Sequence, residues 1–426
     1  MKAPVSRNKE APQSEGLLSP YRVLDLTDEK GLLCGRILGD LGADVIKVER
    51  PGGDPARNIG PFYHDIIEPE KSLFWFAFNT NKRGITLNIE TADGCEIFKS
   101  LVSTADFVIE SFPPSYIASL GLSYPILREV NPRLIMVSLS PFGQTGPYAH
   151  FESSDMVIHA MGGLMTQCGD PDRPPVQVSV PQSFISAATD AAAGAMVAHY
   201  YREITGKGQQ VDVSAMDSVA MNGVEGLVEW TVGKSIFNRR GRLNKLGAGL
   251  FSPIIWECKD GYASYFFMGS LPGARANQRL VEWMNSEGMA PEHLRSIDWE
   301  NLGVEKLTQQ ELDYITKTMA KFFKTHTKAE IQEEAAKRLI MIYPVHNSGE
   351  TLMNPQLESR SFWVNINHDE LNEVITYPGA FAKFSETPIR EWRRAPLIGE
   401  HNQEIYMKEL GMSKDELIAL KGAGVI

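Results

Sequence analysis

Apolar runs in the first half of the chain alternate with amphipathic stretches that end at glycine, and this pattern predicts strands and helices in turn. Residues 21–26 (YRVLDL) predict a short buried strand, 32–41 a helix that ends at Gly42, and 45–49 a second buried strand. A strand, a helix and a second strand in this order form a βαβ unit, whose two strands run parallel. The pattern therefore predicts the start of a parallel sheet.

The same alternation recurs further along the chain. Residues 84–89 predict a strand, 94–104 a helix and 106–109 another strand, while 134–139 (LIMVSL) form a near-continuous apolar run. Strands that are covered on both faces have such runs, because neither face is in contact with water. We therefore predict a doubly wound α/β domain.

An alanine-rich stretch without proline, residues 186–203, predicts a long and closely packed helix. The glycines Gly206 and Gly208 are predicted to end it, since helices commonly close on glycine. One more strand is predicted at 208–213, and 219–230 is predicted to be helical.

The second half of the chain predicts a smaller region that interrupts the large domain. A basic, glycine-dotted stretch at 237–251 predicts a mobile connection, followed by a strand-like segment at 254–267, helices at 278–289 and 309–338, and the start of a returning segment at 342–347. The predicted organisation is a flexible tail at 1–20, the first part of a large α/β domain at 21–215, a linker at 216–250, a small domain at 251–345, and a return segment at 346–426 that completes the large domain.

Composition and charge narrow the function classes. The chain has 426 residues, of which 43% are hydrophobic and 22% charged, and these values are typical of a globular protein with more than one domain. Its formal net charge of −11 argues against nucleic-acid binding, because that function needs a positive surface. No apolar run reaches the about 18 residues of a membrane span, and residues 1–18 lack the apolar core of a signal peptide. We therefore expect a cytoplasmic protein without a membrane role.

The cysteines give no sign of a metal or redox site. Cys34, Cys95, Cys168 and Cys258 are far apart and show neither CxxC spacing nor a cysteine–histidine metal pattern. Isolated cysteines in a chain of this length are typical of buried, reduced thiols. We therefore expect no metal ligands and no catalytic cysteine.

Nine short motifs follow one another along nearly the whole chain. They are LDLT (24–27), LGADVIKVERPGGD (41–54), FNTNKRGITLNI (78–89), NPRLI (131–135), SLSPFGQTGPY (138–148), TGKGQQVDV (205–213), CKDGY (258–262), NPQLESR (354–360) and APLIGEH (395–401). Each motif is short, but together and in this order they resemble the class III CoA-transferases, the formyl-CoA transferase and CaiB/BaiF type.

The resemblance implies both a fold and a reaction. The implied fold is a Rossmann-like large α/β domain formed from both chain ends, a smaller α+β domain between them, and two subunits interlocked like the links of a chain. In the implied reaction, coenzyme A moves from an acyl-CoA to a free carboxylic acid. An aspartate attacks the thioester, giving a mixed anhydride and then an aspartyl-CoA thioester, which splits one difficult exchange into easier steps. Coenzyme A is a substrate here, and no further cofactor is implied.

The residue at the position of the family aspartate is not an acid. In the family this aspartate lies 21 residues before the threonine of the TGxGQ motif, and counting back from Thr205 leads to Phe184. A benzyl side chain has no lone pair with which to attack a thioester. Asp190 lies six residues further on, about 240° around the helix, so it would replace the nucleophile only if the start of the helix were rebuilt. We therefore predict no catalytic residue in this chain.

A racemase is also disfavoured. The racemase branch of the family pairs the aspartate with a histidine, and the corresponding position here is Ser154. Both groups of a two-base proton transfer are therefore missing. His159, five residues further on, is interpreted as a packed core histidine.

The resemblance places coenzyme A contacts on seven residues. Arg50 matches an arginine that approaches the nucleotide end, Leu87 and Phe112 match positions that border the adenine, and Ser111 stands where asparagine is usual. Gly31 retains a backbone that a ligand can approach. The predicted set is Gly31, Arg50, Leu87, Ser111, Phe112, Ser140 and Phe142.

One departure weakens this prediction. Ser119 occupies the place of a family arginine, and a serine offers neither the permanent charge nor the planar fork that binds phosphate. The basic clusters Lys82-Arg83 and Arg239-Arg240-Arg242 are candidates to compensate for this loss.

Three functions from different classes remain open. The first is the non-nucleophilic subunit of a CoA-transferase joined to a homologous subunit that carries the catalytic aspartate, as in the heteromeric benzylsuccinate CoA-transferases of anaerobic aromatic degradation. The second is a self-sufficient homodimeric CoA-transferase that uses another carboxylate, with Asp190, Asp155 or Glu225 as candidates. The third is a non-enzymatic homologue that binds CoA. We favour the first, with succinyl-CoA or another acyl-CoA and a carboxylic acid as substrates, because interlocked subunits share their sites and a silent chain can still be required.

Overall fold

The computed structural model describes residues 16–246, 249–267, 271–303, 306–389 and 392–426. The chain divides into two compact units, which are described one at a time. Unit 1 comprises Met1–Met165, Gln177–Gly233 and Ser359–Ile426, and unit 2 comprises Thr166–Val176 and Lys234–Glu358. The predicted tail at 1–20 lies outside the described residues as far as residue 15. Its last part is held in place, since Leu18 is buried and donates its backbone N–H to Leu41.

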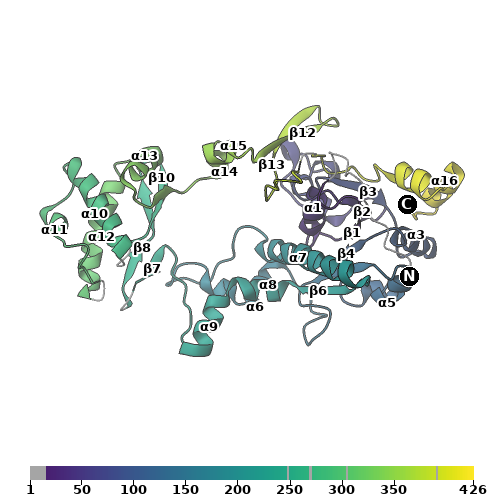
Figure 1. The fold of residues 1–426 in the computed structure, drawn as a ribbon, viewed down its shortest axis with the longest axis horizontal. Coiled ribbons are helices and arrows are strands. Elements are labelled where there is room, and N and C mark those ends of the chain that lie inside the picture. The colour runs from purple at the N-terminus through teal and green to yellow at the C-terminus, as the bar shows by residue number, and fades with distance from the viewer. Residues whose placement is uncertain (1–15, 247–248, 268–270, 304–305, 390–391) are drawn as a thin grey trace, which may run out of the picture. The chain divides into compact units, whose positions relative to one another are not determined.

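A six-stranded parallel sheet is the centre of unit 1 (Figure 1). The order of the strands in space is β3-β2-β1-β4-β5-β6, and every neighbouring pair is parallel. This is the strand order of doubly wound dinucleotide-binding folds, so the predicted fold class is confirmed. The strands are β1 Arg22–Leu26, β2 Asp44–Glu49, β3 Lys82–Thr86, β4 Phe107–Glu110, β5 Ile135–Ser140 and β6 Gln210–Ser214.

Helices cover both faces of this sheet, because successive strand residues point to opposite faces. On β1, Val23 belongs to one apolar core and Leu24 to the other. The first core is closed by α1 and α7, and the second by α3 and α5. These helices are α1 Leu32–Asp40, α3 Ala92–Val102, α5 Tyr124–Val130 and α7 Gln182–Thr205.

The long helix α7 lies close to the sheet because its buried face consists of small residues. An added Cβ at Gly194 would lie 2.9 Å from the Val211 side chain of β6. The helix ends at Gly206, whose φ of 75° is a left-handed conformation that glycine adopts easily. It begins at Gln182, four residues before the predicted start, so Phe184 lies in its first turn. The buried alanines are Ala187, Ala188, Ala191, Ala192, Ala195 and Ala198.

The segment after β6 differs from its prediction. Residues 219–230 were expected to form one helix, but α8 ends at Asn222 and α9 begins at Val224, with Gly223 as the C-cap between them. Residues 216–233 therefore form helices of unit 1 and are not a linker. The other α-helices and strands of unit 1 are α2 Leu73–Phe78, α4 Tyr116–Ser119, α6 Asp155–Met161, α8 Ala215–Asn222, α9 Val224–Gly233, the hairpin β12 Trp363–His368 and β13 Glu373–Pro378, and α16 Lys414–Gly422.

The last part of the chain completes unit 1 beside β3. The backbone N–H of His401 donates to Gly84 at 2.9 Å, and Asn402 accepts from the N–H of Thr86 at 2.9 Å. Further along, the backbone oxygen of Val425 accepts from the N–H of Asn88 at 2.7 Å. Both ends of the chain thus contribute to the large α/β unit, as the resemblance implied.

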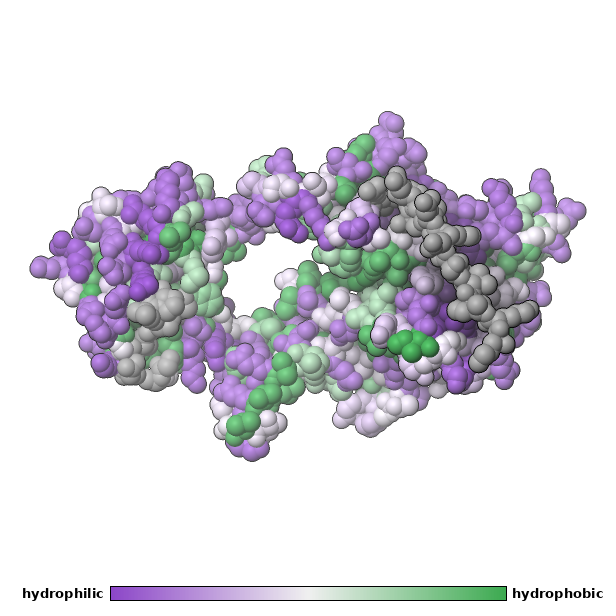
Figure 2. All heavy atoms as spheres, viewed as in Figure 1, coloured by the Kyte–Doolittle hydropathy of each residue, from purple (hydrophilic) through white to green (hydrophobic). Residues whose placement is uncertain are grey.

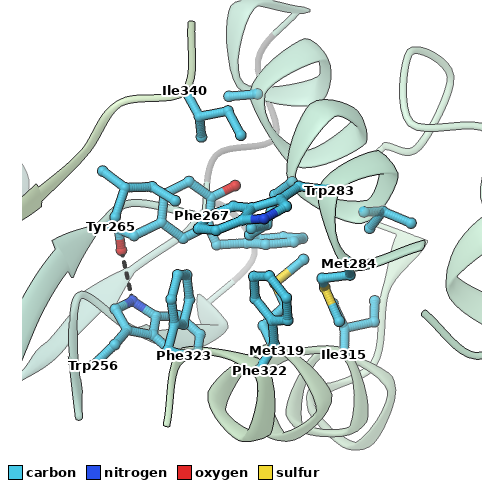
Figure 3. Packing of buried hydrophobic residues seen from close by; sticks show 14 of the residues in the cluster. Trp256, Tyr265, Phe267, Trp283, Met284, Ile315, Met319, Phe322, Phe323 and Ile340 are labelled. Carbon is cyan, nitrogen blue, oxygen red and sulfur yellow. Dashed lines mark hydrogen bonds between the residues drawn. The ribbon is translucent and has the colours of Figure 1, made fainter. Parts of the chain in front are cut away.

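Unit 2 combines short antiparallel strands with helices around its own apolar core (Figure 3). Trp256 and Tyr265 lie on adjacent strands, and the indole N–H of Trp256 donates to the backbone oxygen of Tyr265 at 2.9 Å. Trp283 packs edge to face on Phe322, with ring centroids 4.7 Å apart. The elements are β7 Leu243–Lys245, β8 Phe251–Pro253, β9 Ile255–Cys258, β10 Gly261–Tyr265, β11 Ile342–Pro344, α10 Leu271–Ser286, α11 Glu292–Arg295, α12 Gln309–Phe323, α13 Lys328–Arg338, α14 Ser348–Leu352 and α15 Pro355–Ser359.

Three predictions for this unit need correction. The segment 254–267 is a hairpin of β9 and β10, and 309–338 is two helices, because Thr327 forms a new N-terminal capping box. Residues 342–347 do not begin the return, since β11 pairs with β10 and the unit continues to Glu358.

Candidate active site

A pocket of about 530 Å³ lies at the carboxyl edge of the sheet in unit 1. Residues at or just beyond the ends of four neighbouring strands line it: Leu26 of β1, Glu49 of β2, Leu87 after β3 and Phe112 after β4. The strand order reverses at β1, since β2 and β3 lie on one side of it and β4 to β6 on the other. Open α/β sheets bind ligands at such a switch point, which makes this pocket the candidate site.

Three of the seven predicted contact residues line this pocket. Arg50, Leu87 and Phe112 follow three different strands, and the structure brings them together there. Leu87 is buried and offers an apolar wall. Arg50 is exposed and forms no ion pair within the described ranges, so its guanidinium is available to a phosphate.

Gly31 and Ser111 lie next to the pocket and shape one of its loops. The Ser111 hydroxyl donates to the Asp28 carboxylate at 2.6 Å and accepts the Asp28 N–H at 2.9 Å. Asp28 itself lines the pocket. An added Cβ at Gly31 would lie 2.6 Å from the methyl group of Thr27, so the loop tolerates no side chain there. Ser111 therefore acts on the loop rather than on the pocket.

The other two predicted residues lie at the end of β5 and do not line this pocket. Ser140 is fully buried, and its hydroxyl has no hydrogen-bond partner in the described part of the chain. Phe142 packs edge to face with Tyr148, with ring centroids 6.0 Å apart. The structure therefore assigns these residues to a different part of unit 1 from Arg50.

Buried ion pairs fix the loops around the pocket. Lys47 is fully buried, lies 3.0 Å from Asp54 and donates to the backbone oxygen of Thr27. Burial disfavours its charged form, but Asp54 and Asp25 outweigh this effect and raise the pKa of Lys47. The loops after β1 and β2 are thus tied to one charge, which holds the pocket rim in place.

Sequence reasoning missed two residues on the rim of the pocket. Tyr116 donates its hydroxyl to Glu90 at 2.5 Å, and its ring packs on Phe112 at a centroid distance of 4.9 Å. Both residues line the pocket. Burial together with the bond to Glu90 raises the pKa of Tyr116 to about 12. No local motif marks this pair, because the partners are 26 positions apart and meet only in the fold.

Glu110, at the end of β4, gives a prediction of pH dependence. It is 2% exposed, and burial raises its pKa from 4.5 to about 7 despite hydrogen bonds from Ser138 and the N–H of Phe112. Because the folded state favours the protonated acid, the stability that Glu110 contributes is present below about pH 4.5 and is lost as the pH rises through about 7. The part of this loss that falls between pH 5 and pH 8 is on the order of 2–3 kcal/mol. We expect Glu110→Gln to remove this loss, measured as urea unfolding at pH 5 and pH 8.

The control for this measurement is Glu96→Gln, since Glu96 is an exposed carboxylate on α3. Its pH dependence should match that of the unaltered chain. An E110Q variant that still loses stability between pH 5 and pH 8 would contradict the assignment.

Phe184 is buried in the first turn of α7. Its ring is 8% exposed and belongs to the apolar core beneath that helix. Asp190 is exposed, on a different side of α7, and Glu225 is exposed on α9, so neither reaches this core. The prediction that Asp190 faces away from the position of Phe184 agrees with this arrangement.

Asp155 lies beside the start of α7. Its carboxylate accepts the N–H of Ser183 at 2.9 Å and the side-chain amide of Gln177 at 2.7 Å. It therefore satisfies an N–H at the beginning of a helix that has no capping side chain of its own. His159 is fully buried on α6, as predicted, and within the described residues neither ring nitrogen has a hydrogen-bond partner.

Three of the basic residues proposed to compensate for Ser119 are engaged elsewhere: Lys82, Arg83 and Arg239. Lys82 is buried against Asp25 at 2.8 Å, and Arg83 is held by Asp44 at 2.6 Å. In unit 2, Arg239 donates to backbone oxygens, including that of Arg173 at 3.0 Å. The expectation that Lys82 and Arg83 bind phosphate is therefore wrong, because strong ion pairs already use their charges.

The described residues contain no cluster of three or more His, Cys, Asp or Glu side chains placed to hold a metal ion. All four cysteines are free, and burial raises the pKa of the Cys34 thiol. No helix in the described ranges has both the length and the apolar character needed to cross a bilayer.

Comparison with known proteins decides the family. The sequence model of one family, CoA-transferase family III, matches residues 18–402. The chain belongs to CoA-transferase family III. The resemblance inferred from the motifs is thus confirmed, and membership of CoA-transferase family III supports CoA-transferase activity.

Members of CoA-transferase family III with known names cover almost the whole chain. The succinyl-CoA:(R)-benzylsuccinate CoA-transferase subunit BbsE of Thauera aromatica is 34% identical over 411 residues, with 96% of this chain and 98% of that protein covered. A formyl-CoA:oxalate CoA-transferase of Streptomyces coelicolor is 30% identical over 420 residues, with 96% and 99% covered. The crystal structure of a CaiB/BaiF family protein from Brucella suis superposes with a TM-score of 0.80 at 26% identity, over 93% of this chain and 100% of that one.

Proposed function

We propose that this chain is the non-nucleophilic subunit of a cytoplasmic CoA-transferase, active together with a homologous subunit that carries the catalytic aspartate. The observation that carries the proposal is Phe184, a buried ring that is 8% exposed in the first turn of α7. Counting back 21 residues from Thr205 of the TGxGQ motif, we infer that the family nucleophile corresponds to this position. A hydrocarbon ring cannot serve as that nucleophile, so the carboxylate has to come from elsewhere.

The named relatives support the substrates and the partner. The Thauera aromatica protein is itself a subunit of a succinyl-CoA:(R)-benzylsuccinate CoA-transferase. We therefore propose succinyl-CoA as donor and an aromatic dicarboxylate such as benzylsuccinate as acceptor.

The surface of unit 1 also supports a partner subunit. Helices α6 to α9 carry large apolar side chains that are each at least 42% exposed, and Figure 2 shows apolar atoms gathered over α9. Single chains rarely leave so much apolar surface in water, and an interlocked homologous subunit would cover it. The residues are Met156, Met161, Val197, Tyr200, Ile204, Met221, Leu227, Trp230 and Val232.

In the proposed complex this chain binds coenzyme A, and the partner subunit supplies the carboxylate that attacks the thioester. The partner's carboxylate adds to the thioester carbon, the carbon–sulfur bond breaks, and the CoA thiolate leaves behind a mixed anhydride. The thiolate then attacks the aspartyl carbonyl carbon and releases the first acid. In this chain we assign to Arg50 the pairing with a phosphate of CoA and to Leu87 and Phe112 the apolar walls, since all three line one pocket.

A second candidate function rests on Asp155. This carboxylate lies at the start of α7, next to the turn that contains Phe184, so it is the acidic group best placed to replace the missing nucleophile. In that case the chain would be a self-sufficient transferase. Against this role, both carboxylate oxygens already accept hydrogen bonds, from Ser183 and Gln177.

The test compares the isolated chain with the complex. The purified chain alone should not transfer CoA from succinyl-CoA to benzylsuccinate above background. Coexpression with a homologous chain that has aspartate 21 residues before TGxGQ should raise the rate at least about 100-fold, since the nucleophile is restored. Mass spectrometry of the trapped enzyme–CoA thioester should locate it on the partner.

Matched variants separate the two candidates. Changing the partner's catalytic aspartate to asparagine should abolish transfer, while Asp190→Asn in this chain should leave it unchanged. A CoA thioester trapped on Asp155 of the isolated chain, together with loss of transfer in Asp155→Asn, would establish the self-sufficient enzyme instead.

A further inference from the structure

The rim of the pocket in unit 1 carries an acceptor whose position is fixed. One Glu90 oxygen accepts the Tyr116 hydroxyl at 2.5 Å, and the Glu90 N–H donates to the Asn88 side chain at 3.1 Å. Asn88 is anchored in turn, because its N–H donates to Val425 at 2.7 Å. Within the described part of the chain, the second carboxylate oxygen of Glu90 forms no hydrogen bond or ion pair. It is therefore available to a ligand.

The walls behind this acceptor suit a flat aromatic ring. Leu87 and Ile89 are 2% and 7% exposed and form one apolar side, while Phe112 lies on the adjacent loop with its ring packed on Tyr116. Aromatic rings favour such stacked and edge contacts. The volume of about 530 Å³ lies within the range of about 300–1,000 Å³ that is typical of small-molecule sites.

The charge of the rim selects which edge of a base can lie against it. An ionised carboxylate only accepts hydrogen bonds. Adenine presents an amino donor at C6, whereas hypoxanthine and guanine present a carbonyl acceptor there. A carbonyl against Glu90 would place two acceptors face to face, and neither could donate a hydrogen bond to the other, so this arrangement is unfavourable compared with the amino group of adenine.

We propose that Glu90, positioned by Tyr116, is the residue that selects adenine at the nucleotide end of the acyl carrier, by accepting a hydrogen bond from its 6-amino group. This inference rests on the proposed function, because it takes the pocket to be the coenzyme A site. Glu90 makes the contact with the base, and Tyr116 is a positioning residue that holds the carboxylate toward the pocket.

The test uses the purified full-length chain, coenzyme A, and the coenzyme A analogue in which hypoxanthine replaces adenine. Isothermal titration calorimetry gives both dissociation constants. We expect the unaltered chain to bind coenzyme A about tenfold more tightly than the analogue. In Glu90→Gln the two affinities should become equal within about threefold, because the amide can accept from an amine and donate to a carbonyl. Tyr116→Phe keeps the ring and should give an intermediate ratio.

The matched control is Glu96→Gln, an exposed carboxylate six positions further on, outside the pocket. It should keep the tenfold ratio, and circular dichroism should show that all variants are folded. Equal binding of both ligands by the unaltered chain, or an unchanged ratio in E90Q, overturns this inference while the pocket remains a coenzyme A site. Failure of the unaltered chain to bind either ligand overturns the assignment of the pocket itself, and the inference with it.

Discussion

Replacing Arg57 by methionine is expected to lower the free energy of unfolding of unit 1 by about 3–5 kcal/mol. Arg57 is fully buried and binds Glu49 through two hydrogen bonds of 2.6 and 2.8 Å. It also pairs with Glu70 at 2.7 Å and stacks on Trp75 at 3.8 Å from the ring centroid. The variant would leave Glu49 buried at 1% exposure without its cation. Urea unfolding followed by circular dichroism measures the change.

An exposed ion pair provides the matched control. Lys324 lies 2.7 Å from Glu257, but the two side chains are 55% and 60% exposed. Water and salt screen such a pair, so Lys324→Met should cost at most about 1 kcal/mol. If the two variants lose the same amount, burial of the Arg57 pair is not what stabilises this part of the unit.

Replacing Gly208 by alanine is expected to cost about 3 kcal/mol. This glycine belongs to the TGKGQQ motif, and an added Cβ would lie 1.9 Å from the backbone oxygen of Leu134. The obstacle is backbone at the start of β5, so no side-chain rotation relieves it. The turn would have to move away from the sheet, and the N–H of Gly208 would lose its 3.1 Å bond to Pro132. Thermal unfolding of the variant measures the effect.

Gly422 serves as the comparison for this substitution. It lies in α16, and an added Cβ there would meet nothing within 4 Å. Alanine at this position should stabilise the protein by about 0.5–1 kcal/mol, because the helix is favoured over the unfolded chain. Equal effects of G208A and G422A would show that the close approach to Leu134 is not a constraint.

The parallel sheet could be predicted from the sequence because its strands are buried on both faces. Continuous apolar runs such as 134–139 appear as strands within one or two residues of the predicted bounds. The breaks were harder to predict. The composition of residues 219–230 predicted one continuous helix, but the chain is interrupted at Gly223. Similarly, Thr327 starts a new helix inside a stretch of good helix formers. In both places a single capping residue decided the outcome.

The start of α7 illustrates what local sequence cannot show. Gln182 follows Pro181, and no side chain nearby caps the helix. In its first turn, the backbone N–H of Ser183 donates a hydrogen bond to the carboxylate of Asp155, which lies 28 positions earlier in the chain. The earlier start places Phe184 inside the helix and its ring in the core, a position that only the folded chain reveals.

Part of the candidate pocket could also be predicted from the sequence. Arg50, Leu87 and Phe112 meet in the pocket because all three follow parallel strands, whose carboxyl ends share one edge of the sheet. Ser140 was predicted for the same site but lies further along the sheet, at the end of β5. Glu90 was missed because its role depends on a contact with Tyr116 across two loops.

The return of the chain to β3 determines the order in which the protein can fold during synthesis. His401, Asn402 and Val425 bind the region around β3, yet the ribosome makes them only after all of Lys234–Glu358. His401 follows Thr86, the last residue of β3, by 315 positions, so at about 5–20 residues per second roughly 16–63 s pass between these events. During that interval the outer strand of the nascent sheet lacks its final neighbours and is open to chaperones or to misassembly. Slower translation of unit 2 should therefore lengthen the most vulnerable stage of biogenesis.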